Sequence, residues 1–427
     1  MKNAVFPWGK AAFLFLPGSA NFQALFELEK SVFRAHPAII VFMATEILTA
    51  KRLWTGKETI ENPEILIEDG RIASIVSREA SDEETIAFPQ ATLGPSYFDV
   101  HFHGSAGFDV MEASPEALAA IGVFLAGQGT ANYLATTVTA SLDATLKALD
   151  GLAGLIEAPE KIADSAVARP IGIHLEGPFL STAKCGVQPK EHILKPDVAI
   201  FDRMWEAARG HVHLMTLAPE EPGAEELIRH ATAKGVRVSL GHTNGLAEDA
   251  RRAIAAGARS ATHTFNAMRP FDHREPGVLG EVLTNDALYA ELICDGIHIA
   301  PAAVDLWWRA KGPERALLVT DAMSAAGMPD GEYSLGGFAV EVVGGKAMAR
   351  GVLAGSTLTL ARALENFLRF TGAKLEEGLG LLTRNPAAMV GLESKAGHIE
   401  VGGEANLVAV DATGKLLGSV VRGHFVQ

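Results

Sequence analysis

The chain has 427 residues, of which 48% are hydrophobic, and its formal net charge at pH 7 is −14. This length and apolar content suffice for one large α/β domain with an appendage, or for two to three domains. The negative charge argues against nucleic acid or an anionic membrane as the main partner, although a local basic pocket could still bind an anion. The two cysteines, Cys185 and Cys294, are too far apart in sequence to suggest a disulfide framework; they favour a reducing compartment, the cytoplasm.

The first 42 residues do not share the pattern of the rest of the chain. A short apolar stretch at residues 11–16 is a weak signature of a secretory signal, because Pro17 and Gly18 interrupt it. It is also too short to span a bilayer as a helix. Regular patterning begins at Met43, so we expect residues 1–42 to be an N-terminal extension and Met43 to be the natural translation start.

Both ends of the remaining chain are typical of β-strands. Residues 65–76 read as two short strands around a Glu-Asp-Gly turn, which is a strong hairpin signal. Residues 405–411 and 417–426 are also strand-rich and contain glycine turns. We therefore expect residues 43–93 and 395–427 to form one small β-sandwich domain.

The middle of the chain alternates between apolar runs and helical patterns. Eight runs have the composition of buried parallel strands: residues 98–103, 133–139, 171–176, 214–218, 236–242, 260–264, 290–295 and 316–321. Helical patterns occur at residues 115–128, 142–156, 221–234, 246–256 and 301–309. This alternation predicts an α/β fold, a (β/α)8 TIM-like barrel over residues 94–394, with a doubly wound open sheet as the alternative. After the eighth run we expect a hairpin at residues 332–345, near the barrel mouth, and a helix at 357–370.

Potential metal ligands stand at the ends of these runs. His101 and His103 are two residues apart on one strand, so their side chains point to the same side. Further candidates end the third, fifth, sixth and eighth runs: Glu176, His242, His263 and Asp321. In a barrel of this type the carboxyl ends of the strands meet at one mouth, where catalytic groups sit.

Each of these six residues alone has an ordinary structural interpretation, such as a hydrogen-bonded strand-end histidine or a helix N-cap. The coincidence of residue type and position in all six favours a metal centre. Imidazole and carboxylate together suit zinc or iron better than magnesium or calcium. His174, two residues before Glu176, is expected to support the ligands from behind, whereas His211 and His213 begin a run and are interpreted as structural.

A polar loop at residues 265–277 follows the sixth run. Its donors Asn266, Arg269, His273 and Arg274 suit capture of a phosphate or carboxylate, although the loop could also be an ordinary polar loop paired by Glu275. His298, in residues 295–298, lies at the same predicted mouth and is a candidate for binding a substrate hydroxyl.

From about Met43 to the C-terminus the chain resembles the amidohydrolase superfamily and, within it, the N-acetylglucosamine-6-phosphate deacetylase family. The specific matches are HLEGPF at 174–179, GHT at 241–243, HTFNAM at 263–268, HREPG at 273–277, DGIH at 295–298, TDA at 320–322 and NPA at 385–387. The resemblance implies a divalent metal, most simply zinc with iron possible, as one or two ions per subunit. Glu176, His242 and His263 would bind the main ion, His101 and His103 a second ion, and Asp321 would shuttle protons at the metal centre.

The resemblance also implies the substrate and its contacts. Asn266, the Ala267 backbone and Arg274 would hold the phosphate of an amino sugar, and His298 the sugar. Gln188 stands where relatives usually carry a histidine that helps to hold or polarise the substrate carbonyl; glutamine can donate a neutral hydrogen bond but cannot become charged. The resemblance further implies a homodimer, in which loops approach the neighbour's site.

The expected activity is removal of the N-acetyl group from N-acetylglucosamine 6-phosphate. Alternatives are hydrolysis of another N-acyl amino sugar, an N-acyl amino acid or a cyclic amide, and a non-catalytic metal-binding barrel. A cyclic-amide hydrolase commonly carries a carboxylated lysine where this chain has Glu176, which argues against that group.

Overall fold

The computed structural model describes residues 45–78, 88–163 and 166–426. The expected extension at residues 1–42 and the start at Met43 therefore lie outside the described residues. Within the described ranges, no helix is both long enough and apolar enough to cross a bilayer.

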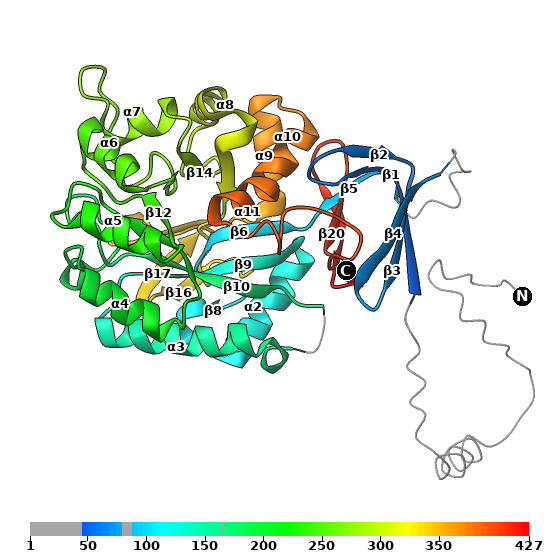
Figure 1. Ribbon diagram of the computed structural model, residues 1–427, viewed down its shortest axis with the longest axis horizontal. Helices are drawn as coiled ribbons and strands as arrows, with labels where there is room; N and C mark the ends of the chain where they lie inside the picture. Colours follow the sequence, from blue (N-terminus) through cyan, green and yellow to red (C-terminus); the bar gives the residue numbers. More distant parts are fainter. Residues whose placement is uncertain (1–44, 79–87, 164–165, 427) are drawn as a thin grey trace, which may run out of the picture.

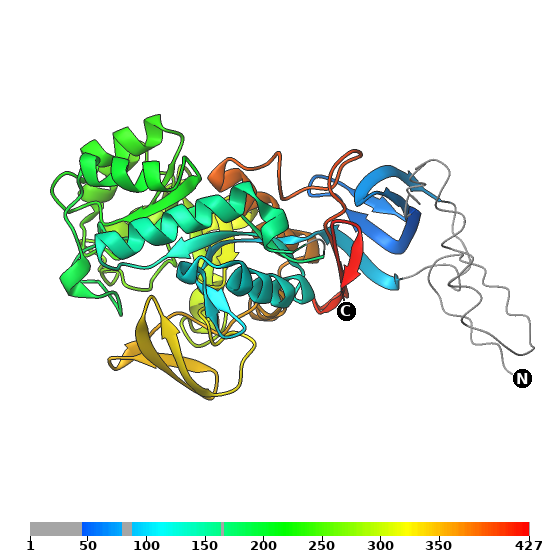
Figure 2. The same ribbon diagram turned by 90° about the horizontal axis from the view of Figure 1, so that it is seen from below.

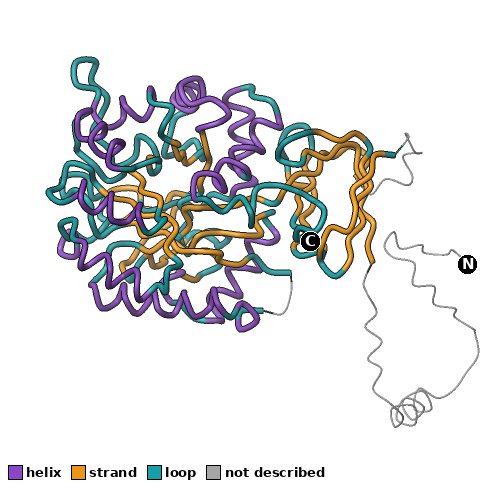
Figure 3. Tube along the Cα trace, viewed as in Figure 1, coloured by secondary structure: helices purple, strands orange, loops and turns teal. Residues whose placement is uncertain are grey.

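Eight parallel strands form the centre of the molecule, and helices surround them (Figures 1 and 3). The strands are β6 (Tyr97–Phe102), β9 (Thr130–Thr137), β10 (Arg169–Glu176), β11 (Val212–Leu217), β12 (Arg237–Leu240), β13 (Ser260–Ala261), β14 (Tyr289–Ile293) and β15 (Ala316–Val319). They are paired in chain order, each with the next, from β6 to β15. Every predicted run corresponds to one of these strands, and the prediction of a TIM-like barrel is confirmed.

The first and last barrel strands meet just beyond their carboxyl ends. The backbone N–H of Asp321 donates to the carbonyl of His101, and the N–H of His103 donates to the carbonyl of Ala322, both at 2.9 Å. A parallel bridge joins Phe102 to Ala322. These contacts nearly close the barrel, and they are made by residues at the mouth itself.

Several of the helices begin at a residue whose side chain caps the first turn. Ser114, Ser141 and Thr359 each accept a hydrogen bond from a backbone N–H in the first turn of the helix that follows. The helices are α2 (Pro115–Gly127), α3 (Leu142–Glu157), α4 (Val198–Ala207), α5 (Ala224–Ala233), α6 (Ala247–Ala256), α7 (Gly277–Thr284), α8 (Pro301–Arg315), α9 (Leu360–Thr371), α10 (Leu375–Leu382) and α11 (Arg384–Val390). Sequence analysis did not predict α4, α7, α10 or α11.

The strands and helices enclose one large apolar core. Its biggest fully buried side chains include Trp307 on α8, Tyr133 on β9, Phe98 on β6 and Phe201 on α4. Burial of each such side chain contributes about 1.5–3 kcal/mol, so the framework that carries the mouth is rigid.

A second sheet contains strands from both ends of the chain (blue and red in Figure 1). Its strands are β1 (Thr45–Trp54), β2 (Thr59–Glu61), β3 (Pro63–Glu68), β4 (Arg71–Ser77), β5 (Phe88–Pro95), β20 (Leu407–Val410), β21 (Leu416–Val421) and β22 (His424–Val426). β5 runs parallel to β1 and antiparallel to β20. The predicted hairpin turn joins β3 to β4 at Asp69 and Gly70, both with positive φ, as a tight two-residue turn requires.

A separate four-stranded antiparallel sheet projects from the barrel (yellow in Figure 2). It comprises β16 (Gly331–Leu335), β17 (Phe338–Val343), β18 (Lys346–Ala349) and β19 (Val352–Leu353), so the predicted hairpin is the first half of a larger sheet. A two-stranded ribbon, β7 (Gly104–Ser105) and β8 (Phe108–Asp109), lies just after β6. Leu335, Phe338 and Val352 line the cavity at the barrel mouth, as expected for the insertion.

Candidate active site

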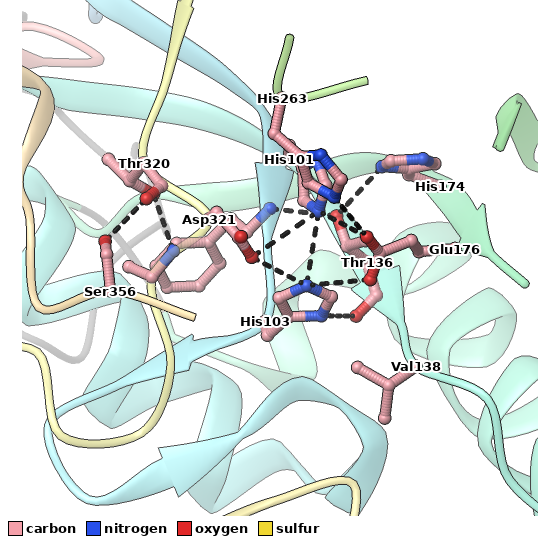
Figure 4. A network of polar contacts seen from close by, with 12 residues as sticks. His101, His103, Thr136, Val138, His174, Glu176, His263, Thr320, Asp321 and Ser356 are labelled. Carbon is pink, nitrogen blue, oxygen red and sulfur yellow. Dashed lines mark hydrogen bonds and ion pairs between the residues drawn. The ribbon is translucent and has the colours of Figure 1, made fainter. Parts of the chain in front are cut away.

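The two histidines of the first strand converge at the barrel mouth. Their Nε2 atoms lie 3.3 Å apart, and both side chains are buried. The Nδ1 atom of His103 donates to the carbonyl of Thr136 at 2.9 Å, while Nδ1 of His101 lies 3.1 Å from a carboxylate oxygen of Glu291 (Figure 4 draws the cluster). Each ring is therefore held by its outer nitrogen, and its inner nitrogen faces the mouth.

A second pair of imidazoles meets Glu176 from the other side. The Nε2 atoms of His242 and His263 each lie 3.0 Å from Oε1 of Glu176 and 3.2 Å from one another. Nδ1 of His242 donates to the carbonyl of Lys184 at 3.0 Å. The same Glu176 also approaches the first pair, at 3.5 Å from His101 and 3.4 Å from His103. One carboxylate thus lies between two groups of imidazole nitrogens.

The hydrogen bonds made by Nδ1 determine what the inner nitrogens can do. A backbone carbonyl can only accept a hydrogen bond, so Nδ1 of His103 and Nδ1 of His242 must each carry a proton. In the neutral form of each ring, Nε2 then carries no proton and presents a lone pair. Lone pairs that face each other and a carboxylate repel unless a cation lies among them. Two sets of atoms could hold such a cation, His101–His103–Glu176 and Glu176–His242–His263.

The electrostatics of the metal-free cluster agree with this reading. Burial opposes protonation of His101, but the carboxylates of Asp321 and Glu176 outweigh burial and hold the pKa of His101 well above its usual value. Burial likewise opposes protonation of His103, yet Asp321 and Glu176 raise its pKa to about 9. Without a metal the site therefore attracts protons, which is the behaviour of a centre built to neutralise positive charge.

Asp321 lies beside the first histidine pair. Its Oδ1 is 3.1 Å from Nε2 of His103 and 3.6 Å from Nε2 of His101. Burial raises the pKa of Asp321, but the charges and hydrogen bonds of His101 and His103 outweigh burial and hold that pKa below its ordinary value. The carboxylate is therefore ionised and able to accept a proton.

Several residues at the mouth have an unusual backbone. His242, His263 and Asp321 have φ angles of 47°, 29° and 49°, in the left-handed region that disfavours side chains. Phe265 and Ala267, in the loop after the sixth strand, also have positive φ. Strain of this kind costs of order 1–3 kcal/mol per residue and concentrates at functional sites. Here it turns the strand-end side chains inward.

A cavity of about 260 Å³ opens above Glu176. Asn266, Ala267 and His298 line it on the side of the sixth and seventh strands, and Val138, Val187 and Leu335 line it with apolar side chains. Nδ2 of Asn266 is buried with no hydrogen-bond partner among the described residues, so it is available to a ligand. Nδ1 of His298 is held 2.6 Å from Oδ2 of Asp295, which orients the ring.

Gln188 is committed to neighbours inside the protein. Its Nε2 donates to Oε2 of Glu176 at 2.7 Å, and its Oε1 accepts from the N–H of Thr139 at 2.7 Å. It also lines the cavity. Besides any contact with substrate, Gln188 holds the Glu176 carboxylate, a function that sequence analysis did not foresee.

The structure does not bring Arg274 into the cavity. Its side chain is exposed, its backbone N–H donates to Asp272 at 2.9 Å, and it is not among the residues that line the cavity. Arg269 and His273, the other predicted donors of this loop, do not line the cavity either. The remaining predicted metal-binding and substrate-binding residues do line it, apart from His101, which contacts the lining residue His103.

Sequence analysis missed Glu291 and Thr136, which hold the first histidine pair. Glu291 is fully buried on β14, and besides His101 it accepts a hydrogen bond from the N–H of His263 at 3.2 Å. A lone carboxylate inside an apolar strand was the available signal. His174, expected to lie behind the ligands, packs its ring against His101 at 4.7 Å between centroids and bonds Thr216.

Comparison with known proteins extends these observations. The amidohydrolase family model matches residues 92–426. The N-acetylglucosamine-6-phosphate deacetylase of Lysinibacillus sphaericus is 39% identical over 354 residues, 82% of this chain and 90% of that protein. The N-acetylgalactosamine-6-phosphate deacetylase of Escherichia coli O157:H7 is 37% identical over 86% of this chain and 96% of its own length.

Among solved structures, a complex of a variant N-acetyl-D-glucosamine-6-phosphate deacetylase from Mycobacterium smegmatis with N-acetyl-D-glucosamine-6-phosphate superposes with a TM-score of 0.83. It is 32% identical and covers 90% of this chain and 99% of that one. The likeness therefore extends over the barrel and both ends of the described chain.

Proposed function

This chain belongs to the amidohydrolase family, and we propose that it removes the N-acetyl group from N-acetylglucosamine 6-phosphate to give glucosamine 6-phosphate and acetate. The observation that carries the proposal is the convergence of four imidazole nitrogens on the Glu176 carboxylate, with the Asp321 carboxylate beside them. Such a centre suits hydrolysis of an amide.

The residues present fit a divalent metal. Glu176, His242 and His263 would hold the main ion, and His101 and His103 a second one, in both cases with Glu176 shared. Nitrogen and carboxylate ligands favour zinc, with iron as the alternative. When bound, the metal supplies water acidified toward neutral pH and a Lewis acid for the amide carbonyl.

Asp321 is proposed to move the proton that hydrolysis requires. Its ionised carboxylate accepts a proton from the attacking water and returns it to the sugar nitrogen, which would otherwise leave as a strongly basic anion. The left-handed backbone at Asp321 and the hydrogen bond from its N–H to His101 fix the carboxylate against the ligand cluster.

The remaining predicted residues would position the substrate. The unpartnered Nδ2 of Asn266 and the backbone of Ala267 suit phosphate oxygens, and His298, oriented by Asp295, suits a sugar hydroxyl. Arg274, which is exposed, would have to approach the outer end of a bound phosphate. The apolar wall of Val138, Val187 and Leu335 suits the methyl group of the acetyl.

N-acetylgalactosamine 6-phosphate is a second candidate substrate, because the Escherichia coli relative that acts on it is 37% identical over nearly its whole length. The two sugars differ only in the orientation of one hydroxyl. A ratio of kcat/KM values for the two, measured on the same preparation, assigns the preferred sugar. An N-acyl amino acid is a third candidate, and it would not need the phosphate-binding loop.

The decisive experiment couples metal analysis to a deacetylation assay. The purified chain should contain zinc or iron, release acetate from N-acetylglucosamine 6-phosphate, and lose this activity on chelation. Unphosphorylated N-acetylglucosamine should be a much poorer substrate, and equal kcat/KM for both would refute the phosphate contacts. A metal-containing protein that hydrolyses no amide in a broad panel would support a non-catalytic barrel instead.

Three further properties belong to the proposal. The exposed Phe271 and Leu246, near the phosphate loop, support a homodimer whose loops approach the neighbouring site, which sedimentation analysis can test. The two free cysteines support a cytoplasmic enzyme. The described parts of residues 43–93 and 395–427 have an apolar core of their own, which supports a small β-sandwich domain beside the barrel of 94–394.

A further inference from the structure

A second polar cavity lies at the opposite end of the barrel from Glu176. Its volume is about 490 Å³. Asn132, near the start of β9, and Arg169, the first residue of β10, line it, whereas Glu176 is the last residue of β10. Much of the remaining lining comes from residues 394–406, and Arg71 on β4 and Arg422, which follows β21, also contribute. The cavity is therefore bounded by the barrel and by the sheet made from both chain ends.

Positive charge dominates this cavity although the chain as a whole is strongly acidic. Arg71, Arg169, Lys395 and Arg422 line it, against the carboxylates of Glu400 and Glu404. Of these carboxylates, Glu400 pairs with His398 and Glu404 accepts from Asn406. Among the described residues, none of the four cations forms an ion pair. A local excess of unpaired cations in a concave site attracts anions.

Arg169 and Arg422 lie in an environment that is unfavourable for buried positive charge. Both Arg169 and Arg422 line the cavity, and burial and the positive charge of Arg169 lower the pKa of Arg422 to about 10 although Glu404 opposes this shift. Both terminal nitrogens of Arg422 donate to a single carbonyl, that of Val167, at 3.1 and 3.0 Å. Nε of Arg169 is buried with no acceptor within the described part of the chain. An unpaired buried donor destabilises the folded chain, and a bound anion that accepts its hydrogen bond would remove this penalty.

The backbone and the neutral lining also favour a ligand. Arg422 has φ of 47°, and its N–H donates to Oδ1 of Asn406 at 2.7 Å, so a strained residue is held in one orientation. The buried side chains of Ser96 and Asn132 add a hydroxyl and an amide to the same cavity. Guanidinium groups together with neutral hydrogen-bond donors form a usual recognition set for phosphate oxygens.

We propose that this cavity binds a small phosphate-bearing anion, and that the bound anion connects the barrel to the terminal sheet. The volume lies within the range of small-molecule sites, and such sites are common at the junction of two packed units. This site is separate from the proposed catalytic centre and does not depend on its assignment. Inorganic phosphate and a sugar phosphate share the required chemistry.

The test uses the full chain and measures thermal unfolding and calorimetric binding. Inorganic phosphate and glucosamine 6-phosphate are each compared with sodium chloride at equal ionic strength. At about a hundredfold excess over Kd, an anion that bridges the two units should raise Tm by about 3 °C. Lys395→Glu should weaken binding about tenfold or more, because it replaces a cation of the site with a carboxylate. Its basal deacetylation should be unchanged.

Two controls locate the binding. Lys51→Glu makes the same change of charge at an exposed position on β1 and should leave Kd unchanged. Asn266→Ala removes a proposed contact in the catalytic cavity, so phosphate binding that survives this change but weakens in Lys395→Glu belongs to the second cavity. Arg169→Gln, which removes a second cation of the site, should also weaken binding. The proposal is overturned if neither anion stabilises the protein beyond chloride, or if Asn266→Ala rather than Lys395→Glu abolishes binding.

Discussion

Substitution of Glu291 by glutamine tests whether the first histidine pair holds an ion. Glu291 is fully buried on β14, with Oε2 at 3.1 Å from Nδ1 of His101 and 3.2 Å from the N–H of His263. Its other oxygen has no partner among the described residues. Glutamine can place its carbonyl oxygen where Oε2 lies and its amide where the unpartnered oxygen lies. The variant therefore keeps the shape and loses the charge.

The size of the effect follows from this geometry. A buried hydrogen bond to a charged group contributes about 1.5–3 kcal/mol, and loss of a carboxylate that orients a metal-binding histidine typically weakens metal binding about 10–100-fold. Because glutamine retains an acceptor, we expect the lower end, about tenfold, for an ion on His101 and His103. Glu291→Leu removes the acceptor and should approach the upper end. Binding to Glu176, His242 and His263 should change little.

The assay is metal content per chain after equilibration with a graded series of chelator concentrations. Wild type should lose its weaker ion at a given chelator concentration, and Glu291→Gln should lose it at about one tenth of that concentration. Glu226→Gln, an exposed change on α5, makes the same alteration of charge and serves as control. The reasoning is refuted if Glu291→Gln binds metal as tightly as wild type, or if it loses both ions together.

Three further changes test the rest of the site. The Asp321→Asn variant should retain its metal, but its kcat should be lower by about a thousandfold or more because the amide cannot accept the proton. A near-normal kcat with normal metal content would exclude Asp321 as the proton carrier. Gln188→Leu removes the hydrogen bonds to Oε2 of Glu176 and from the N–H of Thr139. The unfolding free energy from urea titration should therefore fall by about 2 kcal/mol, and kcat/KM should fall by at least about tenfold. An unchanged urea midpoint would contradict the two hydrogen bonds. The metal-free protein should lose stability as pH rises from 6.5 through about 9, because the pKa of His103 is raised to about 9 and the folded chain there retains a proton that the unfolded chain has released. Melting curves recorded in chelator at several pH values measure this change in stability. The affinity for metal should increase over the same pH range. A Tm of the metal-free protein that increases with pH would contradict the predicted direction of the stability change.

The barrel could be predicted because its strands are buried on both faces. Such strands form continuous apolar runs, and all eight runs correspond to observed strands, with ends displaced by a few residues. The helices α4 and α7 were harder to predict from the sequence. α7 begins at Gly277, directly after Pro276, and both residues normally mark a turn rather than a helix of eight residues.

The candidate ligands could also be predicted, because residue type and position at a strand end are visible in the sequence. The contacts that support these ligands could not be predicted. Glu291 reaches His101 across 190 residues of sequence, and only the register of the barrel brings them together. The positive φ of His242 and His263 depends on the surrounding loops, not on the residues themselves. The side chain of Gln188 contacts Glu176 rather than only the cavity, which a motif position does not reveal.

Residues late in the chain complete both the barrel and the terminal sheet, which matters while the chain is being synthesised. Residues 321 and 322 bond the first barrel strand, and β20 covers the free side of β5. A nascent chain that stops short of residue 321 lacks the contacts that nearly close the barrel, and one that stops short of residue 407 leaves the edge of β5 that faces β20 unpaired. Because unpaired strand edges can pair with other chains, we expect products truncated before residue 407 to aggregate more readily than the full chain.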